Sequence, residues 1–137
     1  MNDLDLTKPH PIPTPETETF WQGLRDEQVL LQKCCSCGAW IFYPRSNCHK
    51  CLSSDLEWRQ VSGEGTLYTF TIARQATSPH FVDEVPQLIA MIDLNEGVRL
   101  TSTMVTNDPE ELTVGAKVVP VFDHVSDKVT LLRYRLG

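Results

Sequence analysis

The 137-residue chain has the length of one compact domain, or of a modest domain with a small appendage. Hydrophobic residues make up 41% of it and charged residues 22%, ordinary values for a soluble globular protein, and the longest apolar run, residues 88–92, is far shorter than the roughly 20 residues that span a membrane. The net charge is −6, and both residues 1–32 and residues 52–137 are acidic, which argues against the basic face that nucleic-acid-binding proteins usually present.

The chain opens with an acidic segment that soon becomes rich in proline. Residues 1–5 carry two acids and no base, unlike a signal peptide, and we expect a cytoplasmic protein. From Pro9 to Pro15 every second residue is proline, which restricts its own φ and biases the preceding residue toward extended conformations. We therefore expect an extended arm over residues 7–15, and two interpretations stay open: a disordered tail, or an arm that packs on a partner.

A short helix is predicted from about Pro15 to Arg25. Thr14 suits the N-cap, proline suits the first helical position, and an acid follows in the first turn. The apolar residues that recur at helical spacing are Phe20, Trp21 and Leu24. This apolar face is too small to fold alone, so we expect the helix to dock on another part of the protein or on another protein.

Five cysteines follow a short predicted strand over residues 29–33, and all of them fall within residues 34–51. A disulfide framework would spread its cysteines and would belong to a secreted chain, so metal binding explains the clustering better. Two Cys-x-x-Cys pairs supply the four thiolates that structural zinc prefers. We predict a zinc ion on Cys34, Cys37, Cys48 and Cys51, and zinc binding is worth on the order of 10 kcal/mol, enough to order this small ribbon.

The same segment holds other residues that could affect the metal. Cys35 could replace Cys34 only by spoiling the first pair, so we interpret it as a free thiol. His49 lies inside the second pair, where a polar residue that is not a ligand commonly sits. Lys33, Arg45 and Lys50 would partly offset the double negative charge of a zinc ion bearing four thiolates.

The remainder of the chain alternates predicted strands with turns. The strands are expected over residues 66–72, 87–94, 98–106, 117–122 and 128–135, with a tight hairpin at 95–97 and one helical turn at 108–112. Five strands with a helical turn between the third and the fourth are typical of the OB-fold, a five-stranded Greek-key barrel. We divide the chain into an arm and helix (residues 1–28), a zinc ribbon (29–56) and an OB-fold domain (57–137).

Several of these motifs together resemble a known family. They are Trp21, residues 30–34, Tyr43-Pro44-Arg45, residues 63–68, Pro86, the strand end Asp93-Leu94, Gly97 and residues 108–112. From about Pro15 to its end the chain is similar to the acyl-CoA-associated family with an N-terminal helix, a rubredoxin-like zinc ribbon and a C-terminal OB-fold. The resemblance implies an accessory subunit of a thiolase-fold enzyme, a thiolase or an aldolase that acts on acyl-CoA thioesters. One departure is Leu52, where the family usually has glycine.

Other functions fit the sequence less well. No catalytic motif surrounds Cys35, His10, His80 or His124, and a zinc ion with four thiolates has no open position for water. In rubredoxin-like iron carriers the two cysteine pairs lie much further apart. A protein that binds single-stranded nucleic acid is the main alternative, but it would need a basic groove with stacking aromatics, whereas the barrel region is acidic and Tyr68 and Phe70 alternate like core residues.

The resemblance leaves the contacts with acyl-CoA or the partner enzyme to be placed. Arg45 and Lys50 could meet the phosphates of coenzyme A, or they could only balance the thiolates. His80 and Phe81 lie in residues 76–86, a connection longer than a hairpin requires, and long loops are often functional. This loop could contact the partner or the acyl-CoA, or Phe81 could fold back and cap the barrel.

Overall fold

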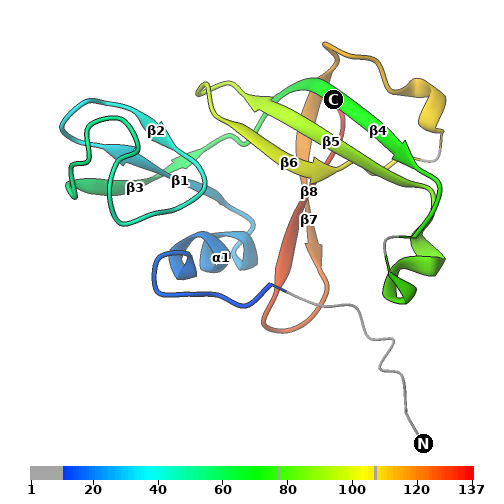
Figure 1. The fold of residues 1–137 in the computed structure, drawn as a ribbon, viewed down its shortest axis with the longest axis horizontal. Helices are drawn as coiled ribbons and strands as arrows, with labels where there is room; N and C mark the ends of the chain where they lie inside the picture. The colour runs from blue at the N-terminus through cyan, green and yellow to red at the C-terminus, as the bar shows by residue number, and fades with distance from the viewer. Residues whose placement is uncertain (1–10, 77, 107) are drawn as a thin grey trace, which may run out of the picture.

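The computed structural model describes residues 11–76, 78–106 and 108–137, and it confirms the predicted mainly β fold. In Figure 1 a three-stranded sheet that carries the cysteine loops lies on the left, a five-stranded barrel sheet lies on the right, and the helix α1 lies below them. His10 and the first part of the predicted arm lie outside the described residues. Residues 11–14 have no regular secondary structure.

Helix α1 spans Glu18–Arg25, so it begins three residues later than predicted. The carbonyl of Thr14 accepts hydrogen bonds from the backbone N–H groups of Thr17 and Glu18 at 3.0 and 2.8 Å. These bonds form a turn that lies before the first residue of the helix. Phe20 and Leu24 are buried, as the apolar spacing predicted. The helix contacts strand β1 (Val29–Cys34) of the ribbon and the barrel strands β7 (Lys117–His124) and β8 (Thr130–Leu136), so it joins the two sheets.

The ribbon sheet has the order β2-β1-β3, with β1 paired antiparallel to both neighbours. Strands β2 (Trp40–Ile41) and β3 (Leu56–Val61) were not predicted. Strand β3 has the sequence Leu-Glu-Trp-Arg-Gln-Val and lies at a sheet edge, where charged side chains are common, so it lacks a clean apolar alternation. Its pairing with β1 runs from Val29 opposite Val61 to Cys34 opposite Leu56, and only the tertiary structure reveals it.

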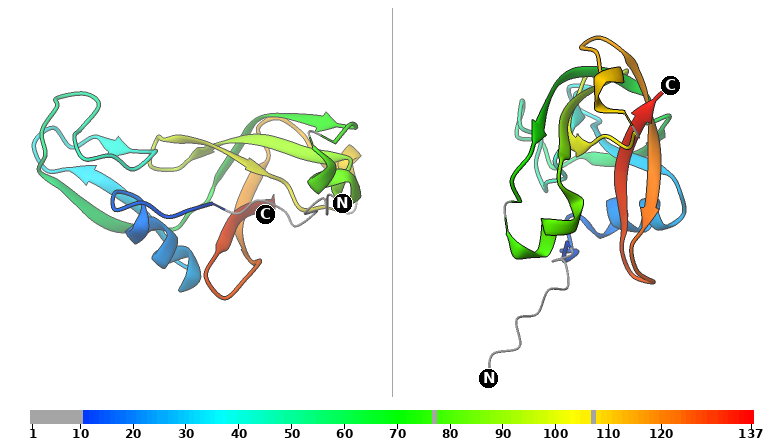
Figure 2. Two further views of the ribbon diagram at one scale, coloured as in Figure 1. Left: turned by 60° about the horizontal axis from the view of Figure 1, so that its bottom comes forward. Right: turned by 90° about the vertical axis from the view of Figure 1, so that its right-hand side faces the viewer.

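The barrel sheet has the order β6-β5-β4-β7-β8, and it nearly closes on itself. The strands not yet introduced are β4 (Gly65–Ala73), β5 (Gln87–Leu94) and β6 (Arg99–Thr103). A parallel bridge from Met104 to Tyr134 and a hydrogen bond of 2.7 Å from the Val105 N–H to the Tyr134 carbonyl bring the end of β6 to β8. Seen end-on in Figure 2, β4 to β6 form one side of the barrel and β7 with β8 the other.

Two 3₁₀ helices lie in the connections of the barrel. The predicted helical turn is η2 (Pro109–Glu111), capped by Asp108, whose carboxylate accepts the N–H of Glu110 at 3.0 Å. The long connection between β4 and β5 contains η1 (Pro79–Glu84), where the sequence alone predicts a loop. Within the described residues, no helix is long and apolar enough to cross a membrane.

At the start of β4 the backbone lies very close to the backbone of β5. A Cβ atom on Gly65 would lie 2.2 Å from the carbonyl oxygen of Asp93, so only glycine allows this approach of β4 to β5. The register then shifts between Leu67 and Thr69, and Tyr68 is the extra residue of a β-bulge. The prediction that Tyr68 is a core residue is therefore wrong, because this residue is 46% exposed.

Candidate metal centre

The two cysteine pairs lie in matching turns at one end of the ribbon sheet. The first turn follows β1, and the Gly38 N–H donates to the carbonyl of Cys34 at 2.9 Å. In the second turn, the Leu52 N–H donates to the carbonyl of Cys48 at 3.0 Å. Gly38 and Leu52 occupy equivalent positions and share the left-handed conformation, with φ of 76° and 65°. Leu52 thus adopts the same left-handed conformation as Gly38, and the second turn forms with leucine where the resemblance leads one to expect glycine.

The four sulfur atoms converge on one point. Those of Cys34 and Cys51 lie 3.5 Å apart, those of Cys37 and Cys48 lie 3.6 Å apart, and all four lie within 4.8 Å of one another. A tetrahedral ion with sulfurs at about 2.3 Å has sulfur–sulfur separations of about 3.8 Å. The geometry and the chemistry of this donor set therefore fit a tetrahedral, thiolate-bound metal ion.

Backbone N–H groups point at the two buried sulfurs. The Cys37 N–H donates to the sulfur of Cys34 at 3.4 Å, and the Lys50 N–H donates to the sulfur of Cys48 at 3.3 Å. The first of these bonds is the main cause that lowers the pKa of Cys34 to about 6, against the opposing effect of burial. The pKa of Cys48 is lowered in the same way, chiefly by the N–H of Cys51. These turns thus prepare two thiolates for a cation.

The raised pKa of Cys51 shows why the four cysteines need a cation to ionise together. The N–H of Ser53 favours the thiolate of Cys51, but the hydrogen bonds with the neighbouring sulfurs, together with desolvation, outweigh it and raise the pKa of Cys51 to about 12. Four adjacent thiolates repel one another, so all four cysteines ionise together only around a positive ion. Metal binding must therefore release protons.

Cys35 and His49 lie apart from the sulfur cluster. Cys35 is exposed, its N–H donates to the Asp55 carbonyl at 2.8 Å, and desolvation together with Asp55 and Glu57 raises the pKa of its thiol. A raised pKa disfavours a nucleophilic thiolate, which agrees with the interpretation of Cys35 as a spare thiol. His49 is exposed and does not belong to the group of potential ligands that the described residues bring together.

Arg45 and Lys50, the predicted basic contacts, are both exposed but lie in different surroundings. The backbone of Arg45 is held by the buried side chain of Gln32, which accepts its N–H at 2.9 Å and donates to its carbonyl at 2.9 Å. Lys50 lines a polar cavity of about 420 Å³ together with His49 and Arg99. The role of Gln32 was missed, although it lies in the lead-in to Cys34 that carries part of the resemblance.

His80 and Phe81, the other predicted contacts, lie in η1 on the far side of the barrel from the cysteine cluster. Phe81 is partly buried and lines a cavity of about 350 Å³ with Leu88 and Met104. The Nδ1 atom of His80 is buried, with no hydrogen-bond partner in the described structure. The structure therefore does not bring the four predicted contact residues into one site.

In comparison with known proteins, two family models match successive parts of the chain. Residues 21–57 match the family model described as "ChsH2, rubredoxin-like zinc ribbon domain", and residues 58–123 match "ChsH2, C-terminal OB-fold domain". A "DUF35 domain-containing scaffold protein" of Methanocaldococcus jannaschii is 31% identical over 109 residues, which cover 78% of this chain and 77% of that protein.

Two further similarities concern larger assemblies. The "Probable enoyl-CoA hydratase alpha subunit" of Thermomonospora curvata is 25% identical over 128 residues, which cover 93% of this chain but only 40% of that protein. Among solved structures, a chain of the "Ltp2-ChsH2(DUF35) aldolase" superposes with a TM-score of 0.82 at 24% identity and covers 93% of this chain and 98% of that one. At this identity the structural likeness establishes the shared fold.

Proposed function

The chain belongs to the DUF35 family of zinc-ribbon and OB-fold proteins, and on this basis we propose that it is a non-catalytic accessory subunit of a thiolase-fold enzyme. The subunit binds one zinc ion and supports the assembly and acyl-CoA binding of a thiolase or aldolase that acts on acyl-CoA thioesters. One observation carries the proposal: 93% of this chain superposes on a chain of the "Ltp2-ChsH2(DUF35) aldolase".

The chemistry of the metal centre supports a structural role for the zinc. Four cysteines complete a tetrahedron and leave no position for a water molecule or a substrate, so the ion cannot act as a Lewis acid. Zinc fits the four thiolates and the tetrahedral spacing better than harder cations do. The ion then holds the two cysteine turns, β2 and the start of β3 in one unit.

The candidate catalytic residues in the described ranges also support a subunit without activity of its own. The Cys35 thiol is disfavoured as a thiolate, and the ring of His124 is engaged by the hydroxyl of Thr130 at 2.7 Å. The Nδ1 atom of His80, in η1, is buried and has no hydrogen-bond partner in the described structure. A nucleophile with an orienting base is therefore not assembled from these three residues.

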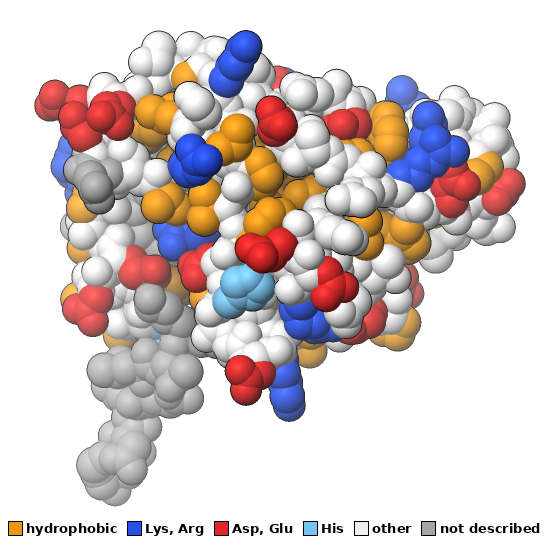
Figure 3. All heavy atoms as spheres, turned by 180° about the vertical axis from the view of Figure 1, so that it is seen from behind, with side chains coloured by type: hydrophobic (Ala, Val, Ile, Leu, Met, Phe, Trp, Pro, Cys, Tyr) orange, Lys and Arg blue, Asp and Glu red, His pale blue; other side chains and the backbone are white. Residues whose placement is uncertain are grey.

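The surface offers apolar side chains to a partner. On the face opposite that of Figure 1, hydrophobic side chains gather in a band across the middle of the molecule, between charged side chains (Figure 3). Val82, Val105 and Val125 are among the exposed large hydrophobic residues. Val82 of η1 is 58% exposed and lies next to His80 and Phe81 in the chain, and exposed apolar side chains can serve as an interaction site. We assign η1 to the partner contact, and Arg45 and Lys50 to the phosphates of coenzyme A.

Binding of single-stranded nucleic acid is the alternative function. Tyr68 is the exposed aromatic residue of β4, but the guanidinium of Arg99 covers its ring at 3.5 Å from the centroid. Arg99 is in turn paired with Asp93 at 2.6 Å. The stacking surface and the cation are therefore already engaged with each other, and the barrel region carries a net negative charge, which disfavours this function.

The proposal is tested by isolating the tagged chain from its native cells and identifying what copurifies. A thiolase-fold protein in fixed stoichiometry is the expected result, whereas recovery of nucleic acid without such a protein would favour the alternative. The purified chain alone should not turn over acyl-CoA thioesters. Thioester cleavage that one substitution of Cys35 or His80 abolishes would show that the chain is itself an enzyme.

A further inference from the structure

The second half of strand β4 has a free edge. The first two residues of β4 pair with β7, where they lie opposite Val118 and Lys117, and the two strands separate after the bulge at Tyr68. From the bulge to its end, β4 pairs within the described residues with β5 alone. We call residues 69–73, with the sequence Thr-Phe-Thr-Ile-Ala, the β4 edge. In the right-hand view of Figure 2 this part of β4 lies at the outer margin of the barrel.

The register with β5 shows which backbone groups of the β4 edge point outward. The carbonyl of Leu88 accepts a hydrogen bond at 2.8 Å from the residue that follows β6, so the backbone groups of Leu88 face β6. Directions alternate along a strand, so those of Ile89 face β4, where Thr71 lies opposite. The N–H and C=O groups of Phe70 and Ile72 therefore point away from β5. In the part of the chain that the structure describes, they have no hydrogen-bond partner.

The side chains of the β4 edge alternate between two kinds. Thr69 and Thr71 are exposed, whereas Phe70 and Ile72 are partly buried and pack against the barrel core. The five residues include no charged residue and no proline. Threonine, phenylalanine and isoleucine all favour the strand conformation. An unpaired edge of this composition is a template to which another strand can add.

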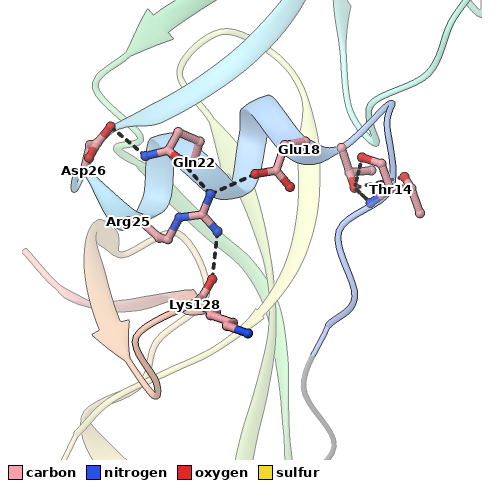
Figure 4. A network of polar contacts seen from close by, with 7 residues as sticks. Thr14, Glu18, Gln22, Arg25, Asp26 and Lys128 are labelled. Carbon is pink, nitrogen blue, oxygen red and sulfur yellow. Dashed lines mark hydrogen bonds and ion pairs between the residues drawn. The ribbon is translucent and has the colours of Figure 1, made fainter.

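Other strand edges of the described structure are protected. Strand β3 carries Glu57 and Arg59, and charged side chains discourage the pairing of exposed edges. Strand β7 has Pro120 in the part that no longer pairs with β4, and proline lacks the N–H that a new strand needs. The turn between β7 and β8 contacts α1, since Arg25 donates to the carbonyl of Lys128 at 2.8 Å (Figure 4). The β4 edge differs from these segments, which points to a strand as its partner.

We propose that the β4 edges of two copies of this chain pair antiparallel about a two-fold axis at Thr71 and join the two barrel sheets. A register that slips by one residue would exchange the apolar and polar faces, so it is disfavoured. With Thr71 opposite Thr71, all of residues 69–73 overlap, and Phe70 lies opposite Ile72 of the second copy. Aromatic residues opposite β-branched ones and threonine opposite threonine are pairs that stabilise sheets, and no like charges meet.

The same register satisfies the outward backbone groups. Phe70 and Ile72 of the second copy become a hydrogen-bonded pair, and the two-fold axis repeats this pair. Thr71 then forms the non-hydrogen-bonded pair at the axis, with Cα atoms about 4.5 Å apart. The contact is isologous and uses the β4 edge of both copies, so it closes at a dimer and does not extend into a fibre.

The contact is short, so the dimer should be weak. An edge of five residues buries less surface than a stable interface, and we expect a dissociation constant between about 1 µM and about 1 mM. Sedimentation equilibrium of the zinc-loaded chain measures this constant. The mass should rise toward that of a dimer as the concentration increases. A wild-type chain that is still monomeric at about 1 mM overturns the proposal.

Charge variants test the register. Thr71→Lys and Thr71→Glu each place like charges at the axis and should weaken the dimer by about tenfold or more, whereas an equimolar mixture of the two should restore it. Thr66→Lys is the matched control, because Thr66 is also exposed but lies where β4 pairs with both neighbours. Circular dichroism and zinc content show that each variant is folded. Equal dimer affinities of Thr71→Lys and Thr66→Lys would refute the proposed interface.

A crosslink tests the two-fold axis directly. In a Cys35→Ser background with zinc bound, Thr71→Cys should form a disulfide between two copies under mild oxidation, because the expected Cα separation of about 4.5 Å suits this bond. Thr66→Cys in the same background should remain reduced. Dimers that crosslink equally through position 66 and position 71 would place the contact elsewhere and contradict the proposal.

The inference goes beyond the proposed accessory role and does not depend on it. A chain that dimerises through the β4 edge but copurifies with no thiolase-fold enzyme contradicts the accessory role and leaves the dimer standing. If the wild type stays monomeric while Thr71→Lys abolishes copurification of the enzyme, the β4 edge receives a strand of the enzyme, and pairing with a second copy is refuted.

Discussion

The hydroxyl of Tyr134 ties the barrel to the segment that enters it from the ribbon. Tyr134 is fully buried in β8, and its hydroxyl donates to the carbonyl of Gly63 at 2.6 Å, in the link between β3 and β4. Tyr134→Phe keeps the packed ring and removes only this donor, which leaves the buried Gly63 carbonyl unsatisfied. The expected loss of unfolding free energy is about 1–3 kcal/mol, the usual cost of such an orphaned group.

The same residue predicts how stability responds to alkali. Burial raises the pKa of Tyr134 in the folded chain, and the charge of Glu96 raises it further. Tyrosine in the unfolded chain ionises at about pH 10. The stabilisation that depends on a neutral Tyr134 hydroxyl is therefore fully present below this pH and is lost above it, by about 1.4 kcal/mol for each pH unit. Tyr134→Phe should remove this part of the alkaline destabilisation.

The assay is denaturant unfolding at fixed zinc, near neutral pH and again up to about pH 11. Tyr43→Phe is the control, because its side chain is 56% exposed and its hydroxyl has no buried partner in the described structure, so it should change stability by less than about 0.5 kcal/mol. The reasoning is refuted if Tyr134→Phe unfolds at the wild-type denaturant concentration and retains the alkaline slope of the wild type.

Three further changes test the ribbon and η1. Cys48→Ser should abolish stoichiometric zinc and unfold the ribbon, whereas Cys35→Ser should keep the metal; zinc analysis with circular dichroism compares them, and zinc retained by Cys48→Ser would disprove the four-cysteine site. Leu52→Gly should stabilise the holoprotein by about 0.5–1 kcal/mol in denaturant unfolding, because it relieves a left-handed backbone that Gly38 adopts freely, and a net loss would contradict this. Phe81→Ala should weaken binding of the partner in a pull-down and leave zinc content and melting temperature nearly unchanged, whereas a loss of roughly 3 kcal/mol at normal partner affinity would show that Phe81 only caps the barrel.

The sequence alone determined the features that rest on local spacing. Two Cys-x-x-Cys pairs are tight turns with fixed sulfur separations, so Cys34, Cys37, Cys48 and Cys51 could be grouped before any fold was known. The alternating strand β5 was predicted with the bounds that the structure shows, because its buried and exposed faces follow the strand period. The order of strands and the helical turn then sufficed for the OB-fold.

The tertiary structure decided what depends on contacts between distant segments. The edge strand β3 has little apolar pattern of its own and exists through its pairing with β1, while the bulge at Tyr68 reverses the face predicted for that residue. Arg25 reaches the carbonyl of Lys128 across 103 residues. Such contacts leave no periodic trace in the chain, because they are set by how the sheets and the helix pack. The apolar cavity between α1, the loop after β2 and the barrel arises from this packing, and for that reason the sequence did not indicate it.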